Sequence, residues 1–196
     1  MYKELTFYYG AMGCGKTRKL LGTRYSKIED GFSVAIMKPQ IDKKGGDYIL
    51  SRENDKVKVD FLIKDKDNIY LEISKYLTKK NLDFILVDEA QFLKKKHIDE
   101  LASVVDILGI SVICYGLRTD FKGELFEGAK RLFEISDNIC EIERQCSCGR
   151  KKMFNMRLVN GKPVFLGEQV AIDGVDASYE AKCRYCYNRE FKENDD

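Results

Sequence analysis

The sequence predicts an α/β fold, in which a parallel β-sheet is flanked by helices and is followed by a small C-terminal domain of zinc-binding β-hairpins. Three observations support this prediction: a glycine-rich motif at residues 10–17, an alternation of apolar strand-like runs with helical patterns before about residue 144, and two close cysteine pairs after it. Fully apolar strands separated by helices are typical of a parallel sheet that is covered on both faces. We expect domains at residues 1–143 and 144–190, and a disordered tail at 191–196.

The first element is a short strand that leads into a phosphate-binding loop. The apolar run Leu5–Tyr9 predicts the strand, and Arg18–Ile28 has apolar residues at helical spacing. Between them lies G-x-x-x-x-G-K-[ST], a motif whose N–H groups and lysine hold phosphates and whose last hydroxyl ligates Mg²⁺. The order of strand, loop and helix argues against a chance glycine turn. The residues expected to bind a nucleoside triphosphate are Gly10, Ala11, Met12, Gly13, Cys14, Gly15, Lys16 and Thr17.

Further strands and helices alternate along the first domain. Apolar runs predict strands at residues 33–37, 84–87 and 110–115, and helical spacing predicts helices at 69–77 and 98–108. The stretch 42–55 is polar, contains Gly45 and Gly46 and has no periodicity, so we expect a mobile loop there. After Arg144, paired cysteines and glycine-containing turns favour short β-hairpins over helices.

Two acidic residues, Asp88 and Glu89, follow the apolar run Phe84–Val87 directly. A carboxylate at the end of such a strand is the usual second element of a phosphate site, where it holds Mg²⁺. A neighbouring carboxylate can accept a proton from an attacking hydroxyl or water, an effect worth roughly 10²–10⁴-fold in rate. The alternative is a strand-end turn with two solvated acids, but the upstream phosphate loop favours the functional interpretation.

Four of the seven cysteines form two close pairs, Cys146 with Cys148 and Cys183 with Cys186. Four thiolates from two turns suit a closed, tetrahedral and structural Zn²⁺ site, which leaves no open position for catalysis. An iron–sulfur cluster or free thiols are the alternatives. The only histidine, His97, follows three lysines at an expected helix start, and we expect it to be a surface residue.

The composition sets limits on compartment and partners. A chain of 196 residues that is 44% hydrophobic and 34% charged can form one soluble domain with a small appendage. Its net charge of +2 gives no strong electrostatic case for binding nucleic acid or a membrane. No apolar run approaches the ~20 residues of a membrane span, and no leader pattern follows Met1. We therefore expect a cytoplasmic protein.

Together these motifs resemble the thymidine kinases of the zinc-containing type II family, and its bacterial members closely, over almost the whole chain. The resemblance is carried by residues 7–17, 87–92, 146–150 and 167–170, by Tyr179, and above all by the segment Cys114–Phe126. It implies transfer of the γ-phosphate of ATP to the 5′-hydroxyl of thymidine or deoxyuridine, with Mg²⁺. It also implies a homotetramer with feedback inhibition by thymidine triphosphate (dTTP).

The resemblance also assigns roles to individual residues. Glu89 falls at the position of the general base and Asp88 at that of the magnesium-site aspartate. The residues of this segment that match the nucleotide site are Asp88, Glu89, Ala90 and Gln91. The residues that match positions enclosing the nucleoside are Met12, Phe92, Leu117, Phe121 and Tyr179.

A loop between the zinc hairpins completes the implied nucleoside site. The resemblance places this loop at about residues 167–179, with Val170, Ile172 and Gly174 nearest the base, which they would bind through main-chain groups. Between Gly174 and Tyr179 the chain has one residue more than the bacterial pattern. Lys44 stands where the family usually has an arginine, so it keeps the charge without the planar fork.

Two other functions compete with a nucleoside kinase. Residues 88–91 also resemble the acidic box of a nucleic-acid-dependent ATPase, but helicases usually need a second ATPase core, for which 196 residues leave no room. A zinc-ribbon binding module with an ATP-controlled switch is the other alternative. ATP consumption that is stimulated by thymidine, rather than by DNA or a protein, distinguishes the three.

Overall fold

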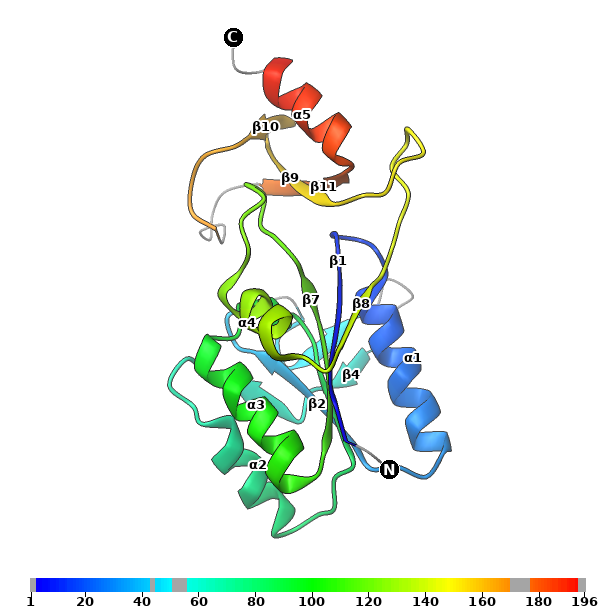
Figure 1. The fold of residues 1–196 in the computed structure, drawn as a ribbon, viewed down its shortest axis with the longest axis vertical. Helices are drawn as coiled ribbons and strands as arrows, with labels where there is room; N and C mark the ends of the chain where they lie inside the picture. Colours follow the sequence, from blue (N-terminus) through cyan, green and yellow to red (C-terminus); the bar gives the residue numbers. More distant parts are fainter. Residues whose placement is uncertain (1–2, 43–44, 51–55, 170–176, 194–196) are drawn as a thin grey trace.

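The computed structural model describes residues 3–42, 45–50, 56–169 and 177–193, and its centre is a six-stranded sheet in the order β5-β2-β6-β7-β1-β8 (Figure 1). All pairings in this sheet are parallel. Its strands are β1 (Leu5–Gly10), β2 (Val34–Pro39), β5 (Phe61–Ile63), β6 (Phe84–Val87), β7 (Ser111–Leu117) and β8 (Asn138–Glu141). The predicted parallel α/β sheet is therefore confirmed.

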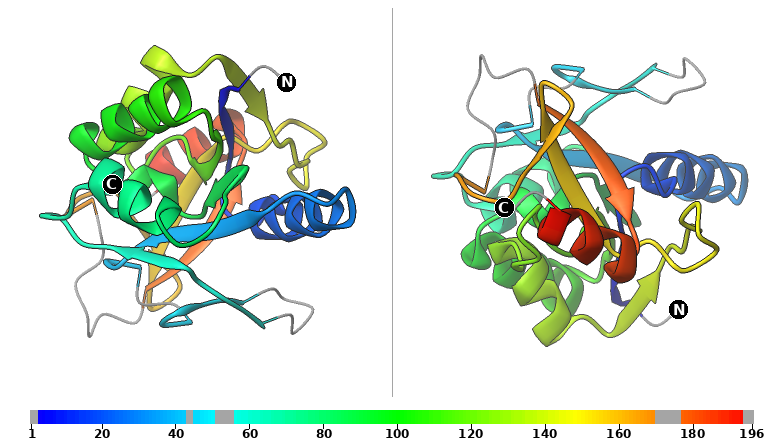
Figure 2. Two further views of the ribbon diagram at one scale, coloured as in Figure 1. Left: turned by 90° about the horizontal axis from the view of Figure 1, so that it is seen from below. Right: turned by 90° about the horizontal axis from the view of Figure 1, so that it is seen from above.

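Helices cover both faces of the sheet (Figures 1 and 2). On one face lies α1 (Lys16–Glu29), and on the other lie α2 (Ile69–Leu77), α3 (Lys95–Leu108) and α4 (Glu127–Ile135). Successive side chains of a strand point to opposite faces. In β6, Leu86 joins the apolar cluster that contains Leu20 of α1, whereas Ile85 and Val87 join the cluster on the other face. Burial of each such side chain contributes about 1.5–3 kcal/mol, which is why apolar residues predominate in the central strands.

The predicted elements of the first domain agree with the structure to within a few residues. The helix at 69–77 and the strand at 84–87 have the predicted bounds, and α3 begins three residues earlier than expected. The expectation of an unstructured loop at 42–55 is wrong in part, because β3 (Tyr48–Leu50) pairs antiparallel with β4 (Lys56–Lys58). Ile49, 2% exposed, packs in the apolar cluster beneath α1 and gives this pair its anchor.

Residues 144–193, here called the C-terminal unit, form a separate antiparallel sheet in the order β10-β9-β11, together with a helix. Its elements are β9 (Phe154–Val159), β10 (Lys162–Val164), β11 (Ala177–Lys182) and α5 (Arg184–Glu193). Hairpin strands are present as expected, but the expectation that helices are absent is wrong. Helix α5 also includes residues 191–193 of the expected disordered tail. It is held by Tyr187, whose ring stacks on Phe154 at 4.8 Å.

His97 is a buried residue, and its predicted surface position is wrong. It is 1% exposed, and its Nδ1 accepts a hydrogen bond from the N–H of Lys94 at 3.3 Å. Burial, more than the neighbouring charge of Lys96, lowers its pKa. The side chain therefore caps the start of α3, while the lysines before it remain exposed.

None of the described helices combines the length and the apolar character that a membrane span requires.

Candidate active site and metal centre

The glycine-rich loop carries the chain from β1 into α1. Gly13 and Gly15 have φ values of 69° and 96°, which glycine adopts without strain. A Cβ atom on Gly10 would lie 2.6 Å from Cys14 Sγ and 2.7 Å from the carbonyl oxygen of Ile142, so the loop closes only around glycine. Among the described residues, no side chain caps the N-terminus of α1. The N–H groups of its first turn can therefore bind an anion.

Lys16 lies in that first turn and folds back across the loop. It is 8% exposed, and its Nζ donates a hydrogen bond to the carbonyl oxygen of Ala11 at 3.1 Å. A cavity of about 530 Å³ opens beside it, lined by the loop residues Gly13, Cys14 and Gly15 and by the cations Arg18, Lys19 and Arg144. Loop amides, a helix N-terminus and several cations thus surround one concave site, an arrangement suited to a phosphate chain.

Asp88 lies buried directly after β6. Its N–H donates to the carbonyl oxygen of Met37 at 2.9 Å, and the residue is 6% exposed. Burial and then the charge of Glu89 raise the pKa of Asp88 to about 7, while Lys16 is close enough to oppose this shift. Its buried Oδ1 accepts no hydrogen bond from any described residue. An orphaned carboxylate oxygen beside the phosphate loop fits a hard divalent cation such as Mg²⁺.

Glu89 precedes the short 3₁₀ helix η1 (Ala90–Phe92) and has a left-handed φ of 49°. Its Oε2 accepts a hydrogen bond from Nε2 of Gln91 at 2.6 Å. The Oε1 atom of Gln91 accepts a second hydrogen bond, from the N–H of Leu117 at 2.9 Å. The expected base is therefore joined, through one buried amide, to the end of β7.

The residues expected to enclose the nucleoside come from segments that are distant in the sequence. Leu117 ends β7, Phe121 follows it in a loop, and Tyr179 lies on β11 of the C-terminal unit. Arg157 connects the last two: its guanidinium lies 3.7 Å from the centre of the Phe121 ring, and its Nε donates to the Tyr179 hydroxyl at 2.9 Å. Phe92 packs edge-on against Phe126. The remaining expected residues, Val170, Ile172 and Gly174, lie outside the described residues, as does Lys44.

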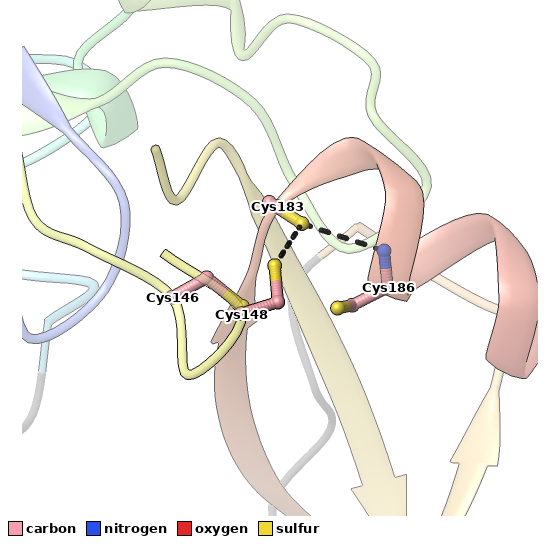
Figure 3. Close-up of side chains that lie close together, drawn as sticks. All are labelled: Cys146, Cys148, Cys183 and Cys186. Atoms are coloured by element: carbon pink, nitrogen blue, oxygen red, sulfur yellow. Dashed lines mark hydrogen bonds between the residues drawn. The ribbon is translucent and has the colours of Figure 1, made fainter. Parts of the chain in front are cut away.

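The four paired cysteines meet in the C-terminal unit (Figure 3). Their sulfur atoms all lie within 4.8 Å of one another, and those of Cys148 and Cys183 are 3.4 Å apart. Four sulfurs around a tetrahedral Zn²⁺, at Zn–S distances of about 2.3 Å, lie about 3.8 Å apart. Hydrogen bonds from the backbone N–H groups of Cys183 and Cys148 lower the pKa of Cys146 to about 6. Interactions with the neighbouring thiols, that of Cys148 foremost, raise the pKa of Cys186 to about 12. A dication would offset the repulsion among the thiolates, so the cluster fits zinc.

Comparison with known proteins identifies the family. A sequence model described as thymidine kinase matches residues 3–187. A thymidine kinase of Haemophilus influenzae is 39% identical over 188 residues, covering 94% of this chain and 95% of that protein. One of Shewanella oneidensis is 40% identical over 193 residues, covering 96% and 97%. The chain belongs to the thymidine kinase family. The structure of Bacteroides Pif1 bound to single-stranded DNA, by contrast, is 16% identical with a TM-score of 0.40 over 74% of this chain and 40% of that one, too distant to bear on function.

Two residues that link the parts of this candidate site have no motif in the sequence. Asn155 and Arg157 both lie on β9 and are 2% and 6% exposed. Oδ1 of Asn155 accepts from the N–H of Met12 at 2.7 Å, and its Nδ2 donates to the carbonyl oxygen of Thr119 at 3.0 Å. Their signal in the sequence is weak: two polar residues at a spacing of two, which places them on one face of a strand.

Proposed function

We propose that this protein transfers the γ-phosphate of ATP to the 5′-hydroxyl of thymidine or deoxyuridine. The observation that carries the proposal is the Asp88–Glu89 pair at the end of β6, where Lys16 of the phosphate loop acts electrostatically on Asp88, in a chain that belongs to the thymidine kinase family. The loop amides and Lys16 would hold the phosphates of ATP. The carboxylate of Glu89 would accept the proton of the 5′-hydroxyl as its oxygen attacks phosphorus and the bond from phosphorus to the β-phosphate oxygen breaks.

Mg²⁺ is part of the proposal, with Asp88 and Thr17 as its protein ligands. The orphaned Oδ1 of Asp88 supports this assignment. Bound there, the ion would supply charge neutralisation to the phosphates. Lys16, which bends over the loop, supplies a second positive charge, and both would act on oxygens whose charge redistributes during transfer.

The C-terminal unit would cover the nucleoside, with zinc holding its two cysteine turns together. The segment 167–179 would form the cover, and its described end at Gln169 supports this role. Nε2 of Gln169 donates to Asp120 Oδ2 at 3.1 Å, and its carbonyl oxygen accepts from Arg157 at 3.3 Å. Aromatic walls such as Phe121 and Tyr179 suit the flat faces of a thymine ring.

The proposal extends to assembly, regulation and location. Like the type II enzymes that it resembles, the protein would be a cytoplasmic homotetramer inhibited by dTTP. Helix α1 supports an assembly, because Tyr25 and Ile28 are 66% and 44% exposed on its surface. A balanced net charge of +2 supports a small-molecule substrate rather than nucleic acid.

The test is a comparison of ATP consumption with thymidine, deoxyuridine, single-stranded DNA or no addition, with thymidine monophosphate measured directly. We expect stimulation by the nucleosides, equimolar nucleoside monophosphate and ADP, and no stimulation by DNA. Lys16→Ala serves as the control, because the phosphates lose their cation, and its activity should be abolished. DNA-stimulated hydrolysis without a phosphorylated nucleoside would instead identify a nucleic-acid-dependent ATPase.

A further inference from the structure

Gln91 is buried between the expected catalytic base and the nucleoside wall. It is 1% exposed, and each polar atom of its side chain has a partner: Nε2 donates to Glu89 Oε2 at 2.6 Å, and Oε1 accepts from the Leu117 N–H at 2.9 Å. A backbone N–H can only donate, so Oε1 must face Leu117 and Nε2 must face Glu89. The amide N–H of Gln91 is thus directed at one oxygen of the Glu89 carboxyl group, which accepts the bond.

Close packing leaves the turn around Gln91 little freedom to move. A Cβ atom on Gly116 of β7 would lie 2.8 Å from Gln91 Oε1 and 3.1 Å from its backbone nitrogen. A Cβ atom on Gly128 of α4 would lie 2.6 Å from the carbonyl oxygens of both Ala90 and Leu93. The left-handed φ of Glu89, 49°, is strained for a residue with a side chain and persists only where surrounding contacts determine the conformation. Because Gly116 and Gly128 have no side chain, β7 and α4 can pack directly against the turn and restrict its movement.

We propose that Gln91 is a positioning residue that orients the Glu89 carboxylate and sets its distance from the nucleoside wall at Leu117. The inference rests on the proposed function, in which Glu89 is the base. It also gives the Gln91 side chain a role other than contacting ATP, because both of its polar atoms already have protein partners. The charge of Glu89 also acts on Asp88, on which Lys16 and Asp42 act in turn.

The experiment compares Gln91→Leu, Gln91→Asn and Gln91→Glu. The Leu variant removes both hydrogen bonds, and the Asn variant keeps the amide but is one methylene too short to span both partners. For each we expect kcat to fall about 10- to 100-fold, the worth of a hydrogen bond to a charged group, with KM for ATP changed less than about threefold. Melting temperature and equilibrium ATP binding show that the variants are folded.

The Glu variant provides a readout that a merely structural role would not move. A protonated carboxyl has one O–H donor and one acceptor oxygen, so it can reproduce both bonds of Gln91. Once ionised, it repels the carboxylates of Glu89 and Asp88. We therefore expect its kcat relative to wild type to be highest at the low end of the accessible pH range and to fall as the pH rises.

Two results would overturn the inference. A Glu variant whose pH profile parallels that of wild type overturns it, as does wild-type kcat in folded Asn and Leu variants. If the Leu variant does not fold, the Glu and Asn variants decide between these outcomes. Wild-type activity with thymidine and its loss in Glu89→Gln test the proposed function separately. An active Glu89→Gln protein would remove the base and with it the role of Gln91, whereas an inactive one beside normal Gln91 variants would overturn this inference alone.

Discussion

The six-stranded sheet and the C-terminal unit are stabilised in different ways. The sheet is buried between two apolar clusters, one on each face, that include side chains at 0% exposure such as Phe7, Ile36 and Leu101. In the C-terminal unit, the buried cluster consists of Cys146, Cys183 and Cys186. The first region can therefore fold through apolar burial, whereas we expect folding of the second to depend in part on a metal bound by its cysteines. We therefore expect binding of ATP to depend mainly on the sheet, and binding of thymidine to depend also on the C-terminal unit.

The largest expected effect comes from the sheet side of the site. Glu89→Gln keeps the size of the side chain and removes the proton acceptor, so we expect kcat to fall by roughly 10²-fold or more with a modest change in KM. Steady-state kinetics with thymidine measure this. Glu180→Gln, at an exposed position on β11, is the matched control and should retain wild-type rates. Near-wild-type kcat in Glu89→Gln would remove this residue from the mechanism.

The next prediction tests whether burial of Asp88 at the end of the sheet makes its ionised carboxylate unfavourable for stability. Burial raises the pKa of Asp88 from 3.8 to about 7, so the folded protein keeps a proton that the unfolded chain releases. The stability contributed by the neutral carboxyl is complete below about pH 4 and is lost as the pH rises through about 7. Asn does not titrate. The free energy of unfolding of Asp88→Asn should therefore exceed that of wild type by a margin that grows over this range to about a few kcal/mol at most. A growing difference in melting temperature between the two proteins measures this margin.

This comparison is made in magnesium-free buffer, because a bound cation would stabilise the ionised carboxylate of the wild type. Asp106→Asn, an exposed substitution on α3, should show a difference from wild type that changes little with pH. If the difference in stability between Asp88→Asn and wild type is constant from about pH 4 to 7.5, the ionised Asp88 carboxylate is stabilised in solution. Its burial then does not lower the stability of the folded protein.

The same contrast explains what could be predicted from the sequence. Strands β1, β6 and β7 of the central sheet are mostly apolar runs bounded by turns, so the sequence predicts them. The edge strands β5 and β8 were not, because they are short and half-exposed. Helix α5 has a polar sequence and is anchored by Cys186 and Tyr187 rather than by a broad apolar face, and periodicity does not report such an anchor.

The site divides along similar lines. Lys16 and the Asp88–Glu89 pair could be found because their chemistry requires fixed residue types next to a strand end. The four cysteines could be paired by spacing and by resemblance. Asn155 and Arg157 could not, because their partners are backbone atoms and rings that only the tertiary fold brings near. His97 was wrongly placed on the surface because its bond to the Lys94 N–H is a local cap that charge patterning obscures.

A smaller effect than those of Glu89→Gln and Asp88→Asn is expected from loss of the metal centre. Wild type should contain one zinc per chain, and Cys183→Ser should lose most of it, because three thiolates and a hydroxyl are a poor ligand set. If the C-terminal unit covers the nucleoside as proposed, affinity for thymidine should fall about tenfold or more and affinity for ATP less, while the sheet remains folded. Metal analysis and equilibrium binding measure both.

Cys140→Ser is the matched control, since Cys140 lies on β8 outside the cluster. It should keep zinc and both affinities. Iron in place of zinc, or less than about half an equivalent of zinc in wild type, contradicts the metal assignment. Full thymidine affinity in a zinc-depleted Cys183→Ser protein would instead separate the metal from the nucleoside site.

The smallest expected effect on the kinetics with thymidine lies at the junction of the two regions. Asn155→Leu leaves the N–H of Met12 and the carbonyl oxygen of Thr119 without their partner, a loss of about 1–3 kcal/mol for each buried group. Part of that loss should appear in stability and part as a several-fold higher KM for thymidine, because Met12 and the loop after Leu117 form the expected nucleoside wall. Asn188→Leu, at an exposed position on α5, is the control and should change neither the stability nor the KM for thymidine. If Asn155→Leu kept wild-type kinetics and lost only stability, the junction would hold the two regions together without shaping the nucleoside site.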